Sequence, residues 1–351
     1  MKRLFFIFLF ITSSVVLAQP KFSEMASRVG AFSRMGFGAR GIGMGNAMSA
    51  VIIGELVSYY NPAVTVFQNN NSAHAGYSFL SIDRNLNFLS FTRHFDFYSK
   101  KDTDVVNRKP RNSAGVSAGI INAGVTNIDG RDNNGLSIGE LSTSENQFFL
   151  AVANKFSEKF SAGISAKFYY YKLYEDVSTS GFGVDIGAIY KVNDQFTVSA
   201  AIMDLNSKYK WDTGSIYGTD GVVTKDKFPN LRKLGISYLN KTLGLLAALE
   251  FENSSAETNI LRAGVEYNIY KDLFLRGGID QFNLNNMDWS VRPSCGFSFY
   301  KAFGNLTVGV ASAGFSFYKS LGNVVVGVDY AFVLEQYSRA DRHIVGLTFN
   351  F

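Results

Sequence analysis

The chain contains very little cysteine: Cys295 is the single one among 351 residues. One cysteine excludes an internal disulfide, so a disulfide framework cannot hold this fold together. Proline is also scarce, with 5 residues, whereas apolar residues make up 46% and aromatic residues 15% of the chain. A disordered chain has the opposite composition. The sequence therefore predicts a folded protein that backbone hydrogen bonds stabilise.

Clusters of basic residues are missing as well. The net charge is +5, but the lysines and arginines are scattered along the chain. A nucleic-acid-binding face would need a basic patch or stripe. We therefore expect no nucleic acid among the partners.

Histidine is rare, and its three copies, His74, His94 and His343, fall on separate predicted strands. No Ser-His-acid arrangement can be built from their spacing. Asp129–Gly135 has oxygen ligands at calcium-like spacing but lacks the Glu that closes a calcium loop. Gly36–Gly41 matches a dinucleotide-binding pattern, yet no strand precedes it. We predict no catalytic residue, metal site or cofactor, and therefore no enzyme.

Long hydrophobic runs are absent after the first residues of the chain. Lys2 and Arg3 are followed by the apolar run Leu4–Ile11 and by small residues that end at Ala18. This layout is typical of a cleavable secretory signal. A retained helical anchor would need about 18 uninterrupted apolar residues, and Thr12–Ser14 breaks the run. The sequence predicts a signal peptide over residues 1–18, and no segment after it fits a transmembrane helix.

The rest of the chain is dominated by segments of about ten residues that alternate apolar and polar side chains, a pattern typical of transmembrane barrels. The sequence therefore predicts an all-β fold, a transmembrane antiparallel β-barrel over residues 73–351. The predicted strands are Ala73–Ile82, Arg84–Phe97, Asn112–Val125, Glu145–Phe156, Lys159–Lys172, Gly181–Val192, Gln195–Leu205, Leu231–Asn240, Leu243–Asn253, Ile260–Ile269, Leu273–Phe282, Val291–Tyr300, a strand that contains Asp329–Phe332, and His343–Phe351.

The last predicted strand ends on Phe351 with an apolar face of alternate residues. A terminal Phe on such a strand resembles the sorting signal of bacterial outer-membrane proteins, which the barrel assembly machinery reads. We expect this strand to close the barrel against Ala73–Ile82. Removing Phe351 should impair assembly.

A tandem repeat precedes that strand: Gly296–Val310 is echoed by Gly314–Val328. Without the extra copy the strands number about 14. With it, two short strands, Asn305–Ser312 and Phe315–Lys319, joined at Ala313-Gly314, would raise the number to 16. Both numbers are even, so both leave the two termini on the periplasmic side.

Short connections alternate with long ones, as such barrels require. We expect the long segments Thr126–Ser144 and Asn206–Asn230 to be extracellular loops. The long charged segment Tyr98–Arg111 does not fit this pattern. The same strand count places it on the periplasmic side, where short connections are expected. Either it is an unusual loop there or the first two strands are misplaced.

Charged residues occupy the inward phase of several strands. A three-residue turn at Tyr270–Asp272 would set Ile269 opposite Leu273, and would thereby pair Glu266 with Arg276 and Arg262 with Asp280. Charges on the lipid face would cost about 2–4 kcal/mol at mid-depth. We expect these four side chains to point into the lumen, where two roles stay open: packing a wet interior or lining a substrate path. The further inward charges are Glu250, Asp329, Asp185 and Lys167.

Residues 19–72 differ from the rest of the chain and predict a hatch in the lumen. They hold a glycine-rich run with Gly41, Gly43 and Gly45, a helix-compatible stretch Ala47–Val57, and the segment Tyr59-Tyr60-Asn61-Pro62-Ala63. These motifs resemble the N-terminal hatch of the PorV/PorQ family, within the wider FadL-like barrels. Two departures are Ile53-Gly54-Glu55, where the family has an acidic pair, and Val64 in place of Gly.

The resemblance implies two functions. PorV-like members take the C-terminal sorting domains of secreted proteins and hand the cargo on in type IX secretion. FadL-like members pass long-chain fatty acids or other hydrophobic small molecules through the barrel. The residues of the hatch motifs match the PorV/PorQ family more closely, which favours the first function. Both imply the outer membrane of a Gram-negative-type bacterium, with outer-membrane lipid as a partner.

Overall fold

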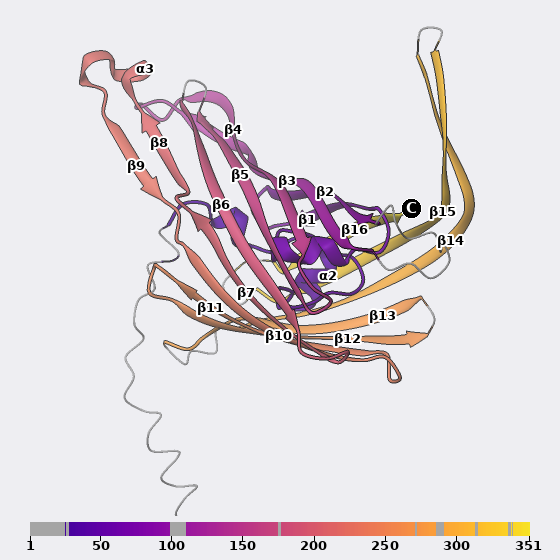
Figure 1. Ribbon diagram of the computed structural model, residues 1–351. Coiled ribbons are helices and arrows are strands. Elements are labelled where there is room, and N and C mark those ends of the chain that lie inside the picture. The colour runs from indigo at the N-terminus through magenta and orange to yellow at the C-terminus, as the bar shows by residue number, and fades with distance from the viewer. Residues whose placement is uncertain are drawn as a thin grey trace, which may run out of the picture.

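The computed structural model describes residues 25, 28–98, 110–174, 177–270, 272–285, 291–312, 315–335, 338 and 340–351. Over these residues, fourteen antiparallel strands close into one barrel (Figure 1). Two further strands, β8 and β9, form a separate ribbon. The predicted fold class is confirmed, with 14 strands in the wall and not 16.

The strands that close the barrel are β1 (Ser72–Phe79), β2 (Arg84–Phe97), β3 (Asn112–Arg131), β4 (Ser137–Lys155), β5 (Phe160–Tyr174), β6 (Val177–Lys191), β7 (Phe196–Leu205), β10 (Leu231–Asn240), β11 (Leu245–Ser254), β12 (Asn259–Tyr270), β13 (Leu273–Asn283), β14 (Arg292–Ser312), β15 (Phe315–Val333) and β16 (Arg342–Asn350). The ribbon consists of β8 (Lys208–Asp212) and β9 (Val223–Lys227), with α3 (Gly214–Tyr217) and η4 (Gly218–Asp220) at its tip.

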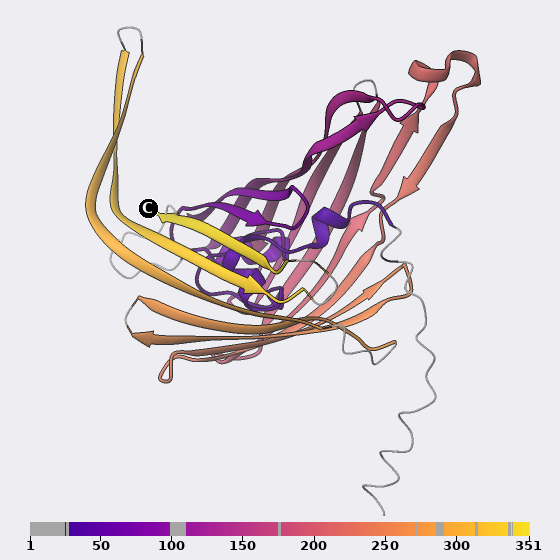
Figure 2. The same ribbon diagram turned by 180° about the vertical axis from the view of Figure 1, so that it is seen from behind.

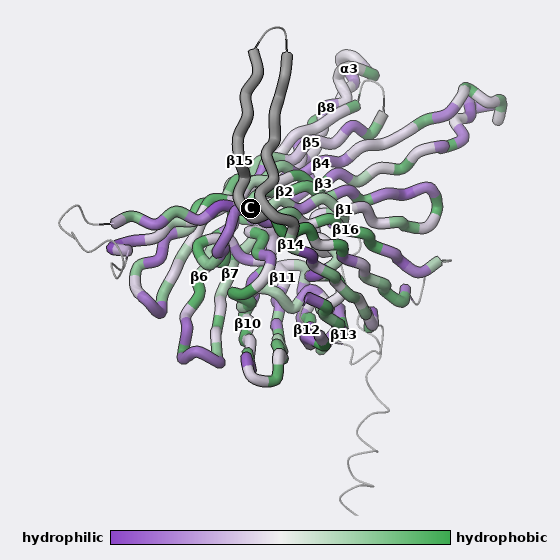
Figure 3. The backbone as a smooth tube through the Cα atoms, turned by 90° about the vertical axis from the view of Figure 1, so that its right-hand side faces the viewer, coloured by the Kyte–Doolittle hydropathy of each residue, from purple (hydrophilic) through white to green (hydrophobic). Residues whose placement is uncertain are grey.

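Alternation along the strands gives the barrel an apolar outer face, and on β12 and β13 it gives a charged inner face. On β12 and β13 the outward Val265 and Leu275 are exposed, whereas the inward Glu266 and Arg276 are buried. Figure 3 shows the same mixture of hydrophobic and hydrophilic positions along the strands. An apolar outer face is what contact with lipid requires.

No helix in the described part of the chain is long and apolar enough to cross a membrane.

The duplicated segment lengthens two strands and adds none. β13 pairs with β14 only over Arg292–Phe299, and β16 pairs with β15 only over Val325–Val333. β14 and β15 continue to pair with each other as far as Ser312 and Phe315. They therefore form a hairpin that runs past the wall (Figures 1 and 2).

The two extra strands expected at Asn305–Ser312 and Phe315–Lys319 were therefore wrong. The residues of the repeat continue two existing strands, so the duplication makes both β14 and β15 longer. The expected joint at Ala313-Gly314 lies outside the described residues.

Two other expected segments differ from the structure. Most of Thr126–Ser144 is strand, because β3 and β4 extend until Arg131 pairs with Ser137. The stretch Ala47–Val57 contains no helix; the helical turns lie on either side of it, in α2 (Gly38–Gly43) and η3 (Pro62–Phe67). Positive φ angles at Gly45 and Asn46 end the helical path just before that stretch.

The described ends of the segment Tyr98–Arg111 lie where the strand count puts them. β2 ends at Phe97 and β3 begins at Asn112, at the same end of the barrel as Phe351. The first two strands are therefore correctly placed. Residues 99–109 lie outside the described residues.

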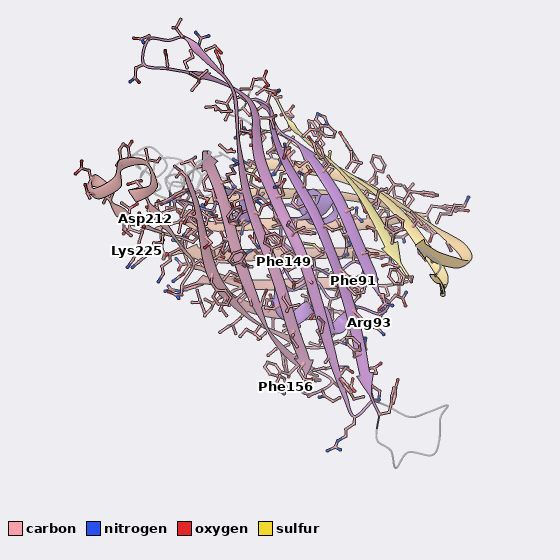
Figure 4. All side chains as sticks on the ribbon, turned by 90° about the horizontal axis from the view of Figure 1, so that it is seen from above. Phe91, Arg93, Phe149, Phe156, Asp212 and Lys225 are labelled. Carbon is pink, nitrogen blue, oxygen red and sulfur yellow. The ribbon has the colours of Figure 1, made fainter. Side chains whose placement is uncertain are left out.

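β16 closes the barrel against β1, with Ala73 opposite Phe349. Phe351 follows the last paired residue, and its backbone N–H and C=O both bond to Asn71, at 3.0 and 3.1 Å. Its ring stacks on Phe91 of β2 with centroids 6.3 Å apart, and Figure 4 labels Phe91 on the wall. Phe351 thus joins the last strand to the first two.

Deleting Phe351 should lower the yield of folded barrel, because it removes two backbone hydrogen bonds at the closing seam and a ring contact of about 1 kcal/mol. The measurement is the fraction of heat-modifiable, folded protein on an unboiled gel. Phe351→Tyr keeps the ring and is the matched control, which should fold normally. Equal yields from the deletion and from Phe351→Tyr would contradict a role for the terminal ring.

Candidate functional site in the barrel lumen

The N-terminal segment 28–71, here named the hatch, lies inside the barrel (Figures 1 and 2). It contains η2 (Ala31–Arg34), α2 and η3. Its apolar side chains and the inward-facing side chains of the wall form one buried core. The hatch therefore fills the lumen over the described residues.

Two glycines of the hatch motif allow close packing. The hydroxyl of Tyr60 occupies the space of a Cβ at Gly41, and this hydroxyl donates to the carbonyl of Phe37 at 2.9 Å. Gly45 has φ +59° and lies against the backbone of β13, where a side chain would collide. Gly43 has room for a Cβ, with Ala331 and Gly296 at contact distance. Gly41 and Gly45 are thus the restrictive positions.

The Asn61-Pro62-Ala63 segment begins η3 and ties it to the wall. Asn61 caps the helix by accepting from the N–H of Ala63 at 3.0 Å, and Pro62 stands at its first position. The Asn61 amide donates to the carbonyls of Ser49 and, on β6, Ala188. One side chain therefore joins two hatch segments to the barrel.

Glycines on the inner face of the wall mark where the hatch rests. Gly264 and Gly278 lie opposite each other on β12 and β13, and a Cβ at either would overlap the backbone of Met44 or Gly45. Neither glycine was expected to contact the hatch. Their inward phase between apolar outward neighbours is the signal that could have found them. Glycines at 115, 163 and 187 make the same room for η3.

The charged ladder on β12 and β13 lies where its residues were expected to meet. Glu266 pairs with Arg276, and the Arg276 Nε is 2.6 Å from the carboxylate. Arg262 Nε lies 2.7 Å from Asp280, although bulges at both ends of the pairing shift the register. One of these bulges sets Tyr270 opposite Leu273, so the expected partner Ile269 was wrong.

Acidic residues of β11 extend this ladder. Arg262 Nη1 lies 3.3 Å from Glu250 and 2.9 Å from Glu252, and Lys233 on β10 contacts both carboxylates. Glu250 also accepts from the N–H of Ser49 in the hatch, at 3.1 Å. The ladder is therefore both a wall element and a hatch contact.

Arg40 of the hatch makes the strongest contact with the ladder. Its Nε and Nη2 both donate to Glu266 at 2.9 Å, while its Nη1 donates to the carbonyls of Ile53 and Glu55. Asn46 donates likewise to Asp280 at 2.9 Å. Two-point arginine–carboxylate bonds are strong and orient both groups. The hatch is thus bound to β12 and β13 by charged groups.

The same polar network continues around the wall to β1. Arg276 bonds to Ser298, and Ser298 to Asp329. Thr348 on β16 lies 2.9 Å from Asp329 and 3.0 Å from the Nδ1 of His74 on β1. Asp329 thus joins strands of the wall to one another. The network that contains Asp329 reaches the hatch through His74, which lies beside Glu55.

Glu55 receives that contact. Its carboxylate accepts from Ser72 at 2.7 Å and from Asn350 at 2.6 Å, and lies 3.5 Å from the Nε2 of His74. Burial alone would raise the pKa of Glu55, but the nearby imidazole of His74 and the hydrogen bonds from Asn350 and Ser72 outweigh burial and lower the pKa to about 2. Glu55 is therefore an anion that fastens the hatch to both strands of the closing seam.

The Glu55 contact should respond to acid in a defined direction. Because the pKa is lowered on folding, the contact stabilises fully above a pH of about 4.5 and is lost as the pH falls toward about 2. We expect Glu55→Gln to lower the melting temperature at pH 7, with a difference from the parent that shrinks below pH 4. Glu140→Gln, at an exposed carboxylate, is the control. A difference that does not vary with pH would contradict this assignment.

A second buried charge cluster lies on β5, β6 and β7. Lys167 Nζ is 2.8 Å from Asp185 and 3.1 Å from Asp204, and the hydroxyl of Tyr169 donates to Asp204 at 2.5 Å. Lys167 and Asp185 were expected to point inward, and both are buried. Asp204 has φ +59° at a bulge between β6 and β7, a backbone detail that the alternation pattern does not reveal.

The opposite side of the hatch meets an apolar wall. Phe37 lies against Phe88 of β2 and Phe149 of β4, with ring centroids 5.1 and 6.0 Å apart; Figure 4 labels Phe149. Leu86 and Ile121 complete this inner surface and are fully buried. The hatch therefore has an ionic contact with β11–β16. Its contact with β2–β4 is mainly apolar and includes one hydrogen bond, from the Thr92 hydroxyl to the carbonyl of Leu56 at 3.0 Å.

Two cavities lie at the ends of the filled lumen. One, of about 320 Å³, lies beneath Ile53–Glu55 and is lined by Arg40, Arg276 and Tyr300. The other, of about 380 Å³, lies at the opposite end beside Phe228. The cavities found between them are near 30 Å³ or smaller. A solute the size of a benzene ring needs a larger cavity than these small ones between the two ends.

The described residues contain no group of three or more His, Cys, Asp or Glu side chains placed to hold a metal ion.

No family model matches the chain, and no curated protein matches it. Solved structures do. The monoaromatic hydrocarbon channel CymD aligns with a TM-score of 0.55 at 14% identity, over 90% of this chain and 98% of that one. The toluene transporters TbuX of Ralstonia pickettii and TodX of P. putida align with TM-scores of 0.55 and 0.54, both at 13% identity and 90% coverage of this chain, over 97% and 99% of theirs. The chain therefore has the fold of these hydrocarbon channels and toluene transporters.

Proposed function

We propose that the protein is an outer-membrane channel that passes hydrophobic small molecules through its barrel when the hatch moves. The carrying observation is the split contact of the hatch: ionic toward β11–β16 and mainly apolar toward β2–β4. The shared fold with monoaromatic hydrocarbon channels supports the same solute class.

The split contact suggests which side opens. Separating Arg40 from Glu266 would strand two buried charges, a step that costs about 3–5 kcal/mol. Separating Phe37 from Phe88 and Phe149 exposes apolar surface, and an apolar solute can cover that surface again. A hydrophobic molecule therefore stabilises an opened β2–β4 side, while the ionic side keeps the hatch attached.

The test is uptake by cells with and without the protein. We expect the protein to raise the uptake rate of labelled toluene severalfold and to leave the rate for glycerol, a small polar solute, unchanged. Equal toluene uptake with and without the protein would overturn the proposal. Equal gains for both solutes would indicate an open pore instead.

Cargo transfer of the PorV/PorQ type is the second candidate. Two features support it. The hatch motifs, Gly41 to Gly45 followed by Asn61-Pro62-Ala63, resemble those of that family, and a ribbon projects from the barrel. An affinity pull-down from membranes separates the two candidates. Recovery of secreted proteins with C-terminal sorting domains would favour cargo transfer, whereas recovery of lipid without such partners favours the channel.

The proposed location follows from the predicted signal peptide and from the barrel. Residues 1–18 would direct export, and the barrel assembly machinery would insert the strand that ends at Phe351. Outer-membrane lipid then contacts the exposed apolar face. The long β3–β4 hairpin and the β8–β9 ribbon, at the end opposite Phe351, would face outward.

A further inference from the structure

Gln147 is a buried glutamine whose side-chain amide has no hydrogen-bond partner among the described residues. It lies on the inner face of β4 and is fully buried, and both its Oε1 and its Nε2 are unpaired within that part of the chain. The large majority of buried side-chain polar atoms in proteins do have a partner. An apolar side chain of similar length would fold here at lower cost. Folding alone therefore does not account for this amide.

The polar neighbours of Gln147 are engaged with other groups. Glu145, two residues away on the same face of β4, accepts from the hydroxyl of Tyr209 at 2.9 Å. Tyr169 lies directly opposite Gln147 on β5 and donates its hydroxyl to Asp204. The polar side chains nearest to Gln147 on β4 and β5 therefore have partners of their own.

The remaining neighbours of Gln147 are apolar and belong to the side of the wall that we propose opens. Ile121 on β3 lies opposite Gln147, and Phe88 on β2 lies opposite Ile121, so the three form one row across the inner face. Phe149, which Figure 4 labels, lies two residues along β4. Phe37 of the hatch covers both Phe88 and Phe149. Moving Phe37 away would therefore uncover an apolar surface bordered by one amide.

We propose that Gln147 is a specificity-determining residue of the channel, and that the surface it borders binds monoaromatic solutes with one hydroxyl group, the phenols. A phenol hydroxyl can donate to the Oε1 and accept from the Nε2 of the amide. Its ring would pack against Phe88 and Phe149 in place of Phe37. The inference rests on the proposed movement of the hatch and narrows the class of solute that passes.

Toluene and p-cresol form a matched pair of probes, because they share a methyl-substituted ring and differ only in the hydroxyl group. Both can cover the aromatic surface, but only p-cresol can pair the amide of Gln147. A site that hydrogen-bonds a hydroxyl discriminates against the analogue that lacks it, since the polar groups of the site then stay unpaired. Both probes require the same hatch movement, so its cost cancels in the ratio of their affinities.

The test is equilibrium dialysis of purified full-length protein in detergent against labelled p-cresol or toluene, with detergent alone as the blank. Gln147→Met keeps the length of the side chain and removes both hydrogen-bonding atoms. It should lower the ratio of p-cresol to toluene affinity about tenfold, as expected for two lost hydrogen bonds. Gln195→Met, at an exposed position, is the matched control and should keep the ratio of the parent.

Stability distinguishes an unpaired amide from one that holds the fold together. Gln68 is also buried, but its Oε1 accepts from the N–H of Leu56 at 3.0 Å. Gln68→Met should therefore lower the temperature at which the folded band disappears in a heat-modifiability series. Gln147→Met should leave this temperature unchanged or raise it, because no hydrogen bond is lost in the closed barrel.

An unchanged affinity ratio in Gln147→Met would overturn the inference. A loss of stability as large as that of Gln68→Met would also overturn it, since the amide would then have a partner in the closed barrel. Equal toluene uptake with and without the protein would instead overturn the channel. The affinity ratio on purified protein would still decide the role of Gln147, so the two proposals fail separately.

Discussion

Gly278→Val should open the barrel to solutes, because the new side chain would overlap the backbone of Met44 and Gly45 in the seated hatch. Backbone atoms cannot rotate away as a flexible side chain can. Overpacking of this kind costs about 1–3 kcal/mol. Since each 1.4 kcal/mol is about tenfold in an equilibrium, the unseated hatch should become at least several times more populated. Single-channel conductance in planar bilayers measures the change.

Gly277→Val is the matched control. Gly277 is the chain neighbour of Gly278, and a Cβ there meets nothing within 4 Å. The same substitution should therefore leave conductance at the parent level. Equal conductance in both variants would contradict the assignment of Gly278 as the seat of the hatch.

Glu266→Ala should give the largest loss of stability in the lumen. The substitution leaves Arg40 and Arg276 buried without the carboxylate that both contact, at 2.9 and 2.6 Å. Removing one partner of a buried ion pair costs about 3–5 kcal/mol. The measurement is the temperature at which the folded band disappears in a heat-modifiability series.

Arg40→Met in the Glu266→Ala background distinguishes an ionic cause from a packing cause. It removes one of the two stranded charges and keeps much of the side-chain volume, so part of the lost stability should return. No recovery in the double variant would contradict the ionic explanation. Glu140→Ala, at an exposed position, should leave the temperature unchanged.

Alternation along single strands was enough to predict the wall. The inward phase of Glu266, Arg276 and Asp280 follows from a period of two and a short turn, both local properties of the sequence. The same locality explains the errors. A bulge at Asn268–Tyr270 moved the partner of Leu273 by one residue, and the repeat lengthened β14 and β15 where new strands were expected.

The contacts between hatch and wall could not be predicted in this way. Arg40 and Glu266 are 226 residues apart, and no periodic pattern relates them. The pairing of Arg40 with Glu266 also changes the result expected from exchanging the charges of Glu266 and Arg276, which the strand register alone would predict to be tolerated. Exchanging Glu266 and Arg276 would restore the wall pair but place an arginine against Arg40, so the exchange should rescue stability only in part.

The central claim is that solutes pass only when the hatch moves, and a reversible lock tests it most directly. The hydroxyls of Ser49 in the hatch and Ser199 on β7 are 3.1 Å apart, so Ser49→Cys with Ser199→Cys, in a Cys295→Ser background, places two thiols within reach of a disulfide. Thr92→Cys with Ser117→Cys joins two wall strands at a similar spacing, 2.9 Å, and is the matched control.

Toluene uptake through the hatch-to-wall pair should stop on oxidation and return on reduction, while uptake through the wall-to-wall pair continues in both states. Uptake that persists with the hatch fully cross-linked would contradict the account.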